Sequence, residues 1–167
     1  MTFITTAGWV AQAVKGAVLH GDADTGIARV CTDARKTEPG DLFVGLRGER
    51  FDGTDFAADA AARGASAVMV SRLIEGINAV QIVVPDVNQA FCESAAAWRQ
   101  RFSIPVISVS GSNGKTTTTQ MIASILCEAY GRDGYLSTEG NFNNSVGVPI
   151  TLWRLRDGMK AAVVGSG

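Results

Sequence analysis

Short apolar runs alternate with polar, glycine-marked breaks along the first part of the chain, a pattern typical of alternating helices and strands. Apolar residues recur at helical spacing behind Thr5 and Thr6, which are able to cap a helix, and this first helix is expected to end by Gly16. Later runs are rich in β-branched residues or repeat at helical spacing. They predict strands at 27–31, 42–46, 67–70 and 82–84, and helices at 55–63 and 86–101.

A domain boundary is predicted between residues 103 and 104, because the long helix ends there and Pro105 stands directly before a new strand. The second part begins with a strand, a glycine-rich loop and a helix that ends at Gly131. Its apolar stripe consists of Met121, Ile122, Ile125, Leu126 and Ala129. The remaining elements are strands at 106–109, 135–137 and 161–164, a loop at 140–149 and a helical turn around Leu152. The sequence therefore predicts an α/β protein, with a small mixed α/β domain at 1–103 followed by the start of a second α/β domain at 104–167.

Composition excludes several classes of protein. Fifteen Lys and Arg stand against sixteen Asp and Glu, for a formal charge of −1, and no basic cluster is present. Nucleic acids and anionic membranes are usually bound through such clusters, so neither is expected as a partner. No apolar run reaches the roughly 18 residues of a membrane span, and the N-terminus does not resemble a signal peptide, which predicts a cytoplasmic protein without membrane insertion. The three widely spaced cysteines are expected to be buried thiols.

The strongest chemical signal lies where the strand at 106–109 gives way to the next helix. Ser110 to Thr117 read SGSNGKTT, and such a strand–loop–helix context is what a phosphate-binding loop requires. Its backbone N–H groups and the positive helix N-terminus would face phosphate oxygens. Lys115 is expected to reach the β- and γ-phosphates, and Thr116 to offer its hydroxyl to Mg²⁺. The competing interpretation is a plain glycine-rich turn, and the loop alone leaves kinase, hydrolase and ligase open.

Three separate parts of the chain resemble motifs of one family, and they occur in the same order as in that family. Val109 to Thr117 is similar to the nucleotide loop of the Mur ligases, which carry an apolar residue where other phosphate loops have their first glycine. The segment 140–149, GNFNNSVGVP, resembles the branch of that family that adds D-alanyl-D-alanine. The segments 33–35, 39–44 and 48–53 are similar to the UDP-binding N-terminal domain of the same branch. The resemblance extends over essentially the whole chain.

The resemblance implies an ATP-dependent ligase of peptidoglycan precursor synthesis that joins D-alanyl-D-alanine to UDP-N-acetylmuramoyl-tripeptide through an acyl phosphate. It implies ATP and Mg²⁺ as cofactors and a monomer. It assigns catalysis to Lys115 and Thr116, with the metal on Thr116. The nucleotide is assigned to Gly111, Ser112, Asn113, Gly114, Lys115, Thr116 and Thr117, and the UDP-linked substrate to Asp33, Arg35, Arg47, Gly48, Phe51, Asn141, Asn143 and Asn144.

Two positions depart from the family pattern. Ala34 stands where a small hydroxyl residue is expected, and Gly165 stands where an acidic residue follows the last strand and helps to hold Mg²⁺. With few strands after Pro105, the chain is expected to be an N-terminal fragment that turns over no substrate alone. The alternatives are a Mur ligase that adds a diamino acid, a folate-type ligase, and a nucleotide-binding module without chemistry. A small-molecule kinase would require a lid and an arginine-rich segment, and neither is visible.

Overall fold

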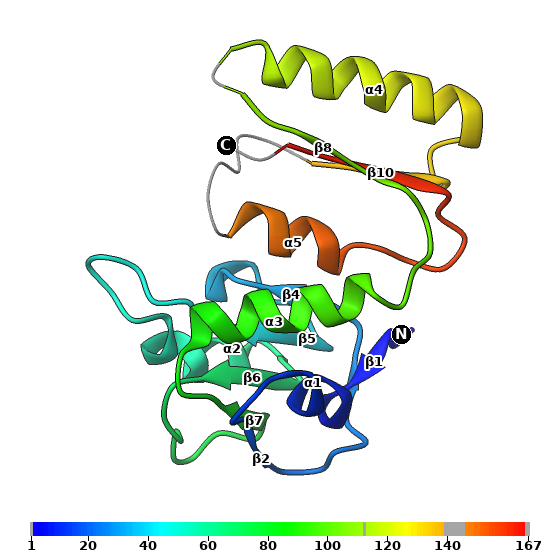
Figure 1. Ribbon diagram of the computed structural model, residues 1–167. Helices are drawn as coiled ribbons and strands as arrows, with labels where there is room; N and C mark the ends of the chain where they lie inside the picture. Colours follow the sequence, from blue (N-terminus) through cyan, green and yellow to red (C-terminus); the bar gives the residue numbers. More distant parts are fainter. Residues whose placement is uncertain (1, 112, 139–145, 166–167) are drawn as a thin grey trace. The chain divides into compact units, whose positions relative to one another are not determined.

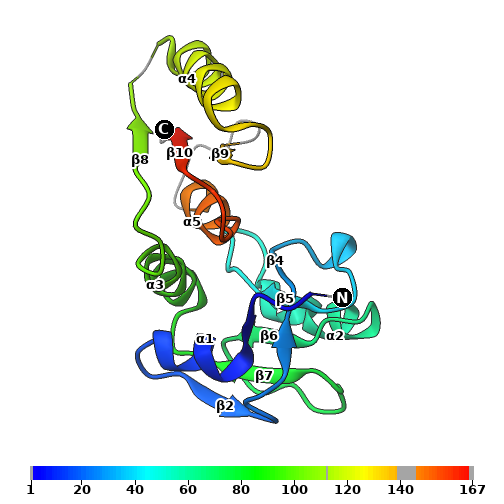
Figure 2. The same cartoon turned by 90° about the vertical axis from the view of Figure 1, so that its right-hand side faces the viewer.

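The computed structural model describes residues 2–111, 113–138 and 146–165 (Figures 1 and 2). The chain forms two compact units, residues 1–94 and 95–167. Each unit combines parallel strands with helices, so the predicted α/β class is confirmed. One helix, α3 (Val87–Arg99), begins in the first unit and ends in the second. The domain boundary predicted between residues 103 and 104 stays a prediction.

The first unit is built on a five-stranded sheet with the order β2-β7-β6-β5-β4. All neighbours are parallel except β2, which runs antiparallel to β7, and a separate antiparallel pair is formed by β1 and β3. The bounds are β1 (Thr5–Thr6), β2 (Val18–His20), β3 (Gly26–Ile27), β4 (Arg29–Cys31), β5 (Asp41–Val44), β6 (Ala67–Val70) and β7 (Val80–Val83). Strands β5 and β6 are buried on both faces, which explains their apolar runs at 42–44 and 67–70.

The helices of the first unit begin where the sequence supplies capping groups. In α1 (Ala7–Ala13), the hydroxyl of Thr6 accepts a hydrogen bond from the N–H of Trp9 at 3.2 Å, as expected of a capping threonine. Two 3-10 turns, Ala34–Lys36 and Gly53–Phe56, are capped in the same way by aspartates. Helix α2 (Ala57–Ala62) follows the second turn and packs its alanines against β5 and β6.

The second unit has a three-stranded parallel sheet with the order β8-β10-β9. Its elements are β8 (Val106–Val109), α4 (Lys115–Tyr130), β9 (Tyr135–Ser137), α5 (Gly147–Trp153) and β10 (Ala161–Gly165). Helices α4 and α5 lie on opposite faces of this sheet (Figures 1 and 2). Trp98 of α3 stacks on Trp153 with ring centroids 5.1 Å apart, and its indole N–H donates to the carbonyl of Leu155 at 3.1 Å. Both tryptophans are therefore core residues.

Several predicted elements differ from the observed ones. The strand expected at 27–31 is interrupted at Ala28, because β3 pairs with β1 whereas β4 pairs with β5. Part of the loop expected at 140–149 is already helical, since α5 begins at Gly147. The predicted apolar stripe of α4 is partly wrong, because Met121 and Ile125 are 62% and 64% exposed. Cys92 is exposed instead of buried.

No helix in the described part of the chain combines the length and hydrophobicity needed to cross a membrane.

Candidate functional site

The predicted phosphate loop occupies the expected place between β8 and α4. It leaves the sheet after Val109 and enters the helix at Lys115. Gly111 and Gly114 have φ angles of +139° and +74°, a region that side chains other than glycine rarely adopt. A Cβ atom at either position would meet no atom of the described residues within 4 Å, so both glycines serve the backbone conformation of the loop.

The N-terminus of α4 is open towards solvent. No side chain of the described residues caps it, and the N–H of Thr118 donates to the carbonyl of Gly114 at 2.9 Å as the first bond of the helix. The preceding N–H groups have no acceptor within a regular helix, and they lie at the positive end of the helix dipole. Asn113, Thr116 and Thr117 are exposed and Lys115 is half-buried, whereas the predicted Ser112 lies outside the described residues. This arrangement suits a phosphate group.

A complete Mg²⁺ site is not formed by the described residues. Thr116 offers an exposed hydroxyl, but phosphate-loop proteins add a carboxylate from the end of a neighbouring strand. Here β10 is that neighbour, and it ends in Gly165 opposite Val109. No group of three or more His, Cys, Asp or Glu gathers anywhere in residues 2–111, 113–138 and 146–165. The residues present therefore fit phosphate better than they fit its metal.

In the first unit, Asp33 and Arg35 bind each other. The Asp33 carboxylate accepts from the Arg35 backbone N–H at 2.9 Å and from its guanidinium at 3.0 and 3.1 Å. Hydrogen bonding to Arg35 lowers the pKa of Asp33, and the same contact raises the pKa of Arg35. The Arg35 side chain is 85% exposed. Ala34, between them, is buried among the apolar residues under α2, so a hydroxyl at this position would have entered the core.

Arg47, Gly48 and Phe51 lie together in a small loop after β5. The loop is closed by a bridge between Arg47 and Asp52 and by a 2.9 Å bond from the Gly48 N–H to the Phe51 carbonyl. Phe51 is 59% exposed and meets Phe56 edge-on, with ring centroids 6.2 Å apart. Strands β4 and β5 are parallel neighbours, so this loop and the Asp33–Arg35 pair leave the sheet at the same edge.

Two residues that sequence reasoning missed support this loop. Asn88 of α3 accepts from the Arg47 N–H at 2.8 Å and donates to the Arg47 carbonyl at 3.0 Å. Arg72, which follows β6, forms ion pairs with Asp52 and Asp55. The Asn88 contact joins positions 41 residues apart, and no local spacing signals it. The loop is thus held by α3 as well as by its own turn.

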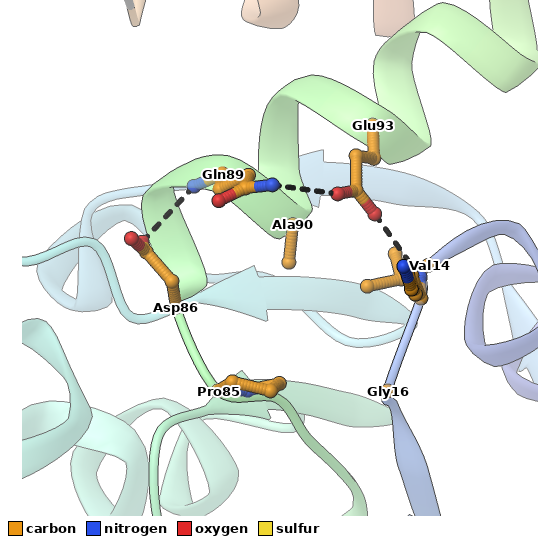
Figure 3. Close-up of a pocket in the computed structure, with 8 residues that line it drawn as sticks. Val14, Gly16, Pro85, Asp86, Gln89, Ala90 and Glu93 are labelled. Carbon is orange, nitrogen blue, oxygen red and sulfur yellow. Dashed lines mark hydrogen bonds between the residues drawn. The ribbon is translucent and has the colours of Figure 1, made fainter.

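A pocket of about 260 Å³ lies elsewhere in the first unit (Figure 3). Asp86 accepts from the N–H of Gln89, while Glu93 accepts from the Gln89 amide and from the N–H of Lys15. Both carboxylates of the pocket are thus hydrogen-bonded within the chain. None of the predicted site residues lines the pocket. The predicted Asn141, Asn143 and Asn144 lie outside the described residues.

Comparison with known proteins covers both units. The profile described as "Mur ligase family, catalytic domain" matches residues 26–111, and "Mur ligase middle domain" matches residues 109–166. The UDP-N-acetylmuramoyl-tripeptide--D-alanyl-D-alanine ligase of Synechocystis sp. is 45% identical over 143 residues, 84% of this chain and 31% of the relative.

Two solved structures agree. MurF from Acinetobacter baumannii is 38% identical, with a TM-score of 0.87 over 98% of this chain and 36% of that one. MurF ligase from Thermotoga maritima in complex with ADP is 28% identical, with a TM-score of 0.69 over 83% of this chain and 32% of that one. The chain spans about a third of the length of the relatives it matches. Since a family profile covers more than half of the chain, the chain belongs to the Mur ligase family.

Proposed function

We propose that this chain supplies the UDP-substrate-binding unit and the phosphate loop of a ligase that joins D-alanyl-D-alanine to UDP-N-acetylmuramoyl-tripeptide. One observation carries the proposal: a MurF structure superimposes on 98% of the chain with a TM-score of 0.87. Because the chain spans about a third of that structure, the remaining substrate contacts are expected from residues outside it.

The chemistry requires activation of a carboxylate, because a free carboxylate is a poor electrophile. In the proposed reaction the peptide carboxylate attacks the γ-phosphorus of ATP, which yields an acyl phosphate and ADP. The amine of D-alanyl-D-alanine then attacks the acyl carbon, phosphate leaves, and an amide bond results. The N-terminus of α4 and Lys115 bind the phosphate oxygens and stabilise their charge, while positioning of the reactants supplies much of the remaining acceleration. The ADP complex of a relative supports adenine nucleotide as the phosphate donor.

In the first unit, we assign the UDP part of the substrate to the sheet edge after β4 and β5. Arg35 and Arg47 supply cations for a pyrophosphate, and the exposed ring of Phe51 offers a face to a planar base. Asn141, Asn143 and Asn144 carry amides able to donate and accept, and we assign them to the same substrate. Asp33 orients Arg35 through their paired hydrogen bonds.

Calorimetric titration of the chain with UDP-N-acetylmuramoyl-tripeptide tests the proposal. Saturable binding is expected, with weaker binding of UDP-N-acetylglucosamine. Phe51→Ala and Arg35→Ala are expected to weaken it, and Lys15→Ala, which removes an exposed cation at the pocket of Figure 3, is the matched control. Preference for the muramoyl dipeptide would indicate the ligase that adds a diamino acid. If the chain alone converted added ATP to ADP and phosphate, the expectation that it turns over no substrate would be overturned.

A further inference from the structure

Position 165 lies at the edge of the sheet from which the phosphate loop departs. Strand β10 pairs in parallel with β8, and Gly165 stands opposite Val109, the last residue before the loop. Ligands of parallel α/β sheets bind outside the carboxyl ends of the strands, and the strand beside the phosphate loop is the usual source of a carboxylate for nucleotide-bound Mg²⁺. The glycine at this position leaves the edge without that group.

Nothing in the surrounding structure requires glycine at position 165. Its φ angle is not positive, so the backbone suits any L-residue. Among the described residues, a Cβ atom there would have one neighbour within 4 Å, the Thr119 hydroxyl oxygen at 3.5 Å, which is an ordinary contact distance. The Gly165 N–H donates to the hydroxyl of Thr138 at 2.9 Å and would do the same from another residue. A carboxylate side chain therefore fits the backbone and the space.

The neighbour of this position is itself unusual. Thr119, on the buried face of α4, is 8% exposed, and its hydroxyl has no hydrogen-bond partner among the described residues. Leaving a buried hydroxyl unpaired is unfavourable, and native structures rarely do so without a reason. The Thr119 hydroxyl is directed at the place where a side chain on residue 165 would begin. A carboxylate there would accept a hydrogen bond from this hydroxyl and be oriented by it.

We propose that the glycine at position 165 leaves this chain without a carboxylate for Mg²⁺ beside the loop, so that its phosphate site binds nucleotide independently of the metal. Thr119 is the positioning residue that would orient a carboxylate at this point. The inference rests on the proposed nucleotide site at the N-terminus of α4. Mg²⁺ prefers oxygen ligands and commonly takes one or two carboxylates in addition to the phosphates. The Thr116 hydroxyl is a single neutral oxygen and does not replace them.

The test compares binding of the nonhydrolysable ATP analogue AMP-PNP in excess Mg²⁺ and in EDTA, by calorimetry on the 167-residue chain. The unchanged chain is expected to bind with affinities that agree within about twofold in the two buffers, less than 0.5 kcal/mol apart. Gly165→Asp is expected to bind about tenfold or more tightly in Mg²⁺ than in EDTA. Gly165→Asn, which has the same shape without the charge, is expected to show no such gain.

The role of Thr119 is tested in the same assay. In the double variant Gly165→Asp with Thr119→Val, the gain from Mg²⁺ is expected to fall by about tenfold, the effect of one hydrogen bond to a charged group, while affinity in EDTA stays unchanged. A merely structural effect of the valine would lower binding in both buffers. An undiminished gain in the double variant would overturn the positioning role.

The remaining outcomes separate the inference from the proposed function. If Gly165→Asp bound AMP-PNP with the same affinity in Mg²⁺ and in EDTA, the inference would be overturned and the nucleotide site would stand. A tenfold Mg²⁺ gain in the unchanged chain would also overturn it, and Glu139→Gln would show whether that carboxylate, which follows Thr138 in the sequence, is the source. Absence of AMP-PNP binding in every variant and both buffers would overturn the inference together with the nucleotide site.

Discussion

Removal of the Asn88 side chain should loosen the loop after β5 without disturbing the sheet. Asn88 makes two hydrogen bonds to the backbone of Arg47, at 2.8 and 3.0 Å. Each such bond contributes about 0.5–1.5 kcal/mol net, and the lower half of that range applies because water reaches both groups. Asn88→Ala is therefore expected to lower the free energy of opening of the loop by about 1–2 kcal/mol, which is a five- to thirtyfold change in the opening equilibrium.

Native-state hydrogen exchange measures this opening directly. The reporters are the amides of Gly48 and Gly53, which donate to the carbonyls of Phe51 at 2.9 Å and Leu46 at 2.8 Å. Their protection should fall by the stated factor, while amides of the central strands keep theirs. Gln89→Ala is the matched control, because Gln89 is the next residue of the same helix and bonds to Glu93 instead of the loop. Unchanged protection in Asn88→Ala, or an equal loss of protection in the control, would refute the role of Asn88 in holding the loop closed.

Three further predictions concern stability and titration. Thr119→Val should raise the free energy of unfolding of the second unit by about 1 kcal/mol, measured by thermal unfolding, because it removes a buried hydroxyl that has no partner among the described residues. Asp41→Ala should cost about 2–3 kcal/mol in urea unfolding, since its carboxylate is 2% exposed and accepts three hydrogen bonds, whereas Glu38→Ala, an exposed partner of the same arginine, should cost under about 0.5 kcal/mol. Asp33 should titrate below its ordinary pKa in carbon-detected NMR, and Arg35→Ala should restore that pKa. Because the folded pKa is lowered, this pair stabilises the fold above the unfolded pKa, and the stabilisation is lost as pH falls through the folded pKa.

Each of these predictions has a contradicting result. A lower melting temperature for Thr119→Val would mean that its hydroxyl is paired in solution. Equal losses for Asp41→Ala and Glu38→Ala would mean that burial does not decide the strength of the two ion pairs. If the pKa of Asp33 stayed the same in Arg35→Ala, its shift would have another cause than the contact with Arg35.

The local sequence was sufficient to predict an element where its pattern of residues fits only one structure. The strands at 67–70, 106–109 and 135–137 were predicted with their exact bounds, because β-branched or aromatic runs stand there between turn residues. The glycine-rich loop that is predicted to bind phosphate lies between strand and helix, as its glycines and its lysine at fixed offsets indicate.

The errors arise where a local pattern fits two structures. In α4 the apolar residues allow two overlapping faces, and the sheet buries the face that contains Thr119 and Leu126 while Met121 and Ile125 stay exposed. At the start of α5, Gly147 and Pro149 are typical of a loop, yet proline is tolerated in the first turn of a helix. Contacts between distant segments, such as Asn88 with Arg47, leave no trace in local spacing.

The continuity of α3 bears on how the protein can be dissected into pieces. The helix runs unbroken through residues 94 and 95, where the two units divide. A protease or a designed truncation that cuts after residue 103 would leave Trp98 on the N-terminal piece and its stacking partner Trp153 on the other. The loss of a buried tryptophan typically costs about 3–5 kcal/mol, comparable with the whole stability of many small domains. The C-terminal piece is therefore expected to need the last turns of α3 in order to fold alone.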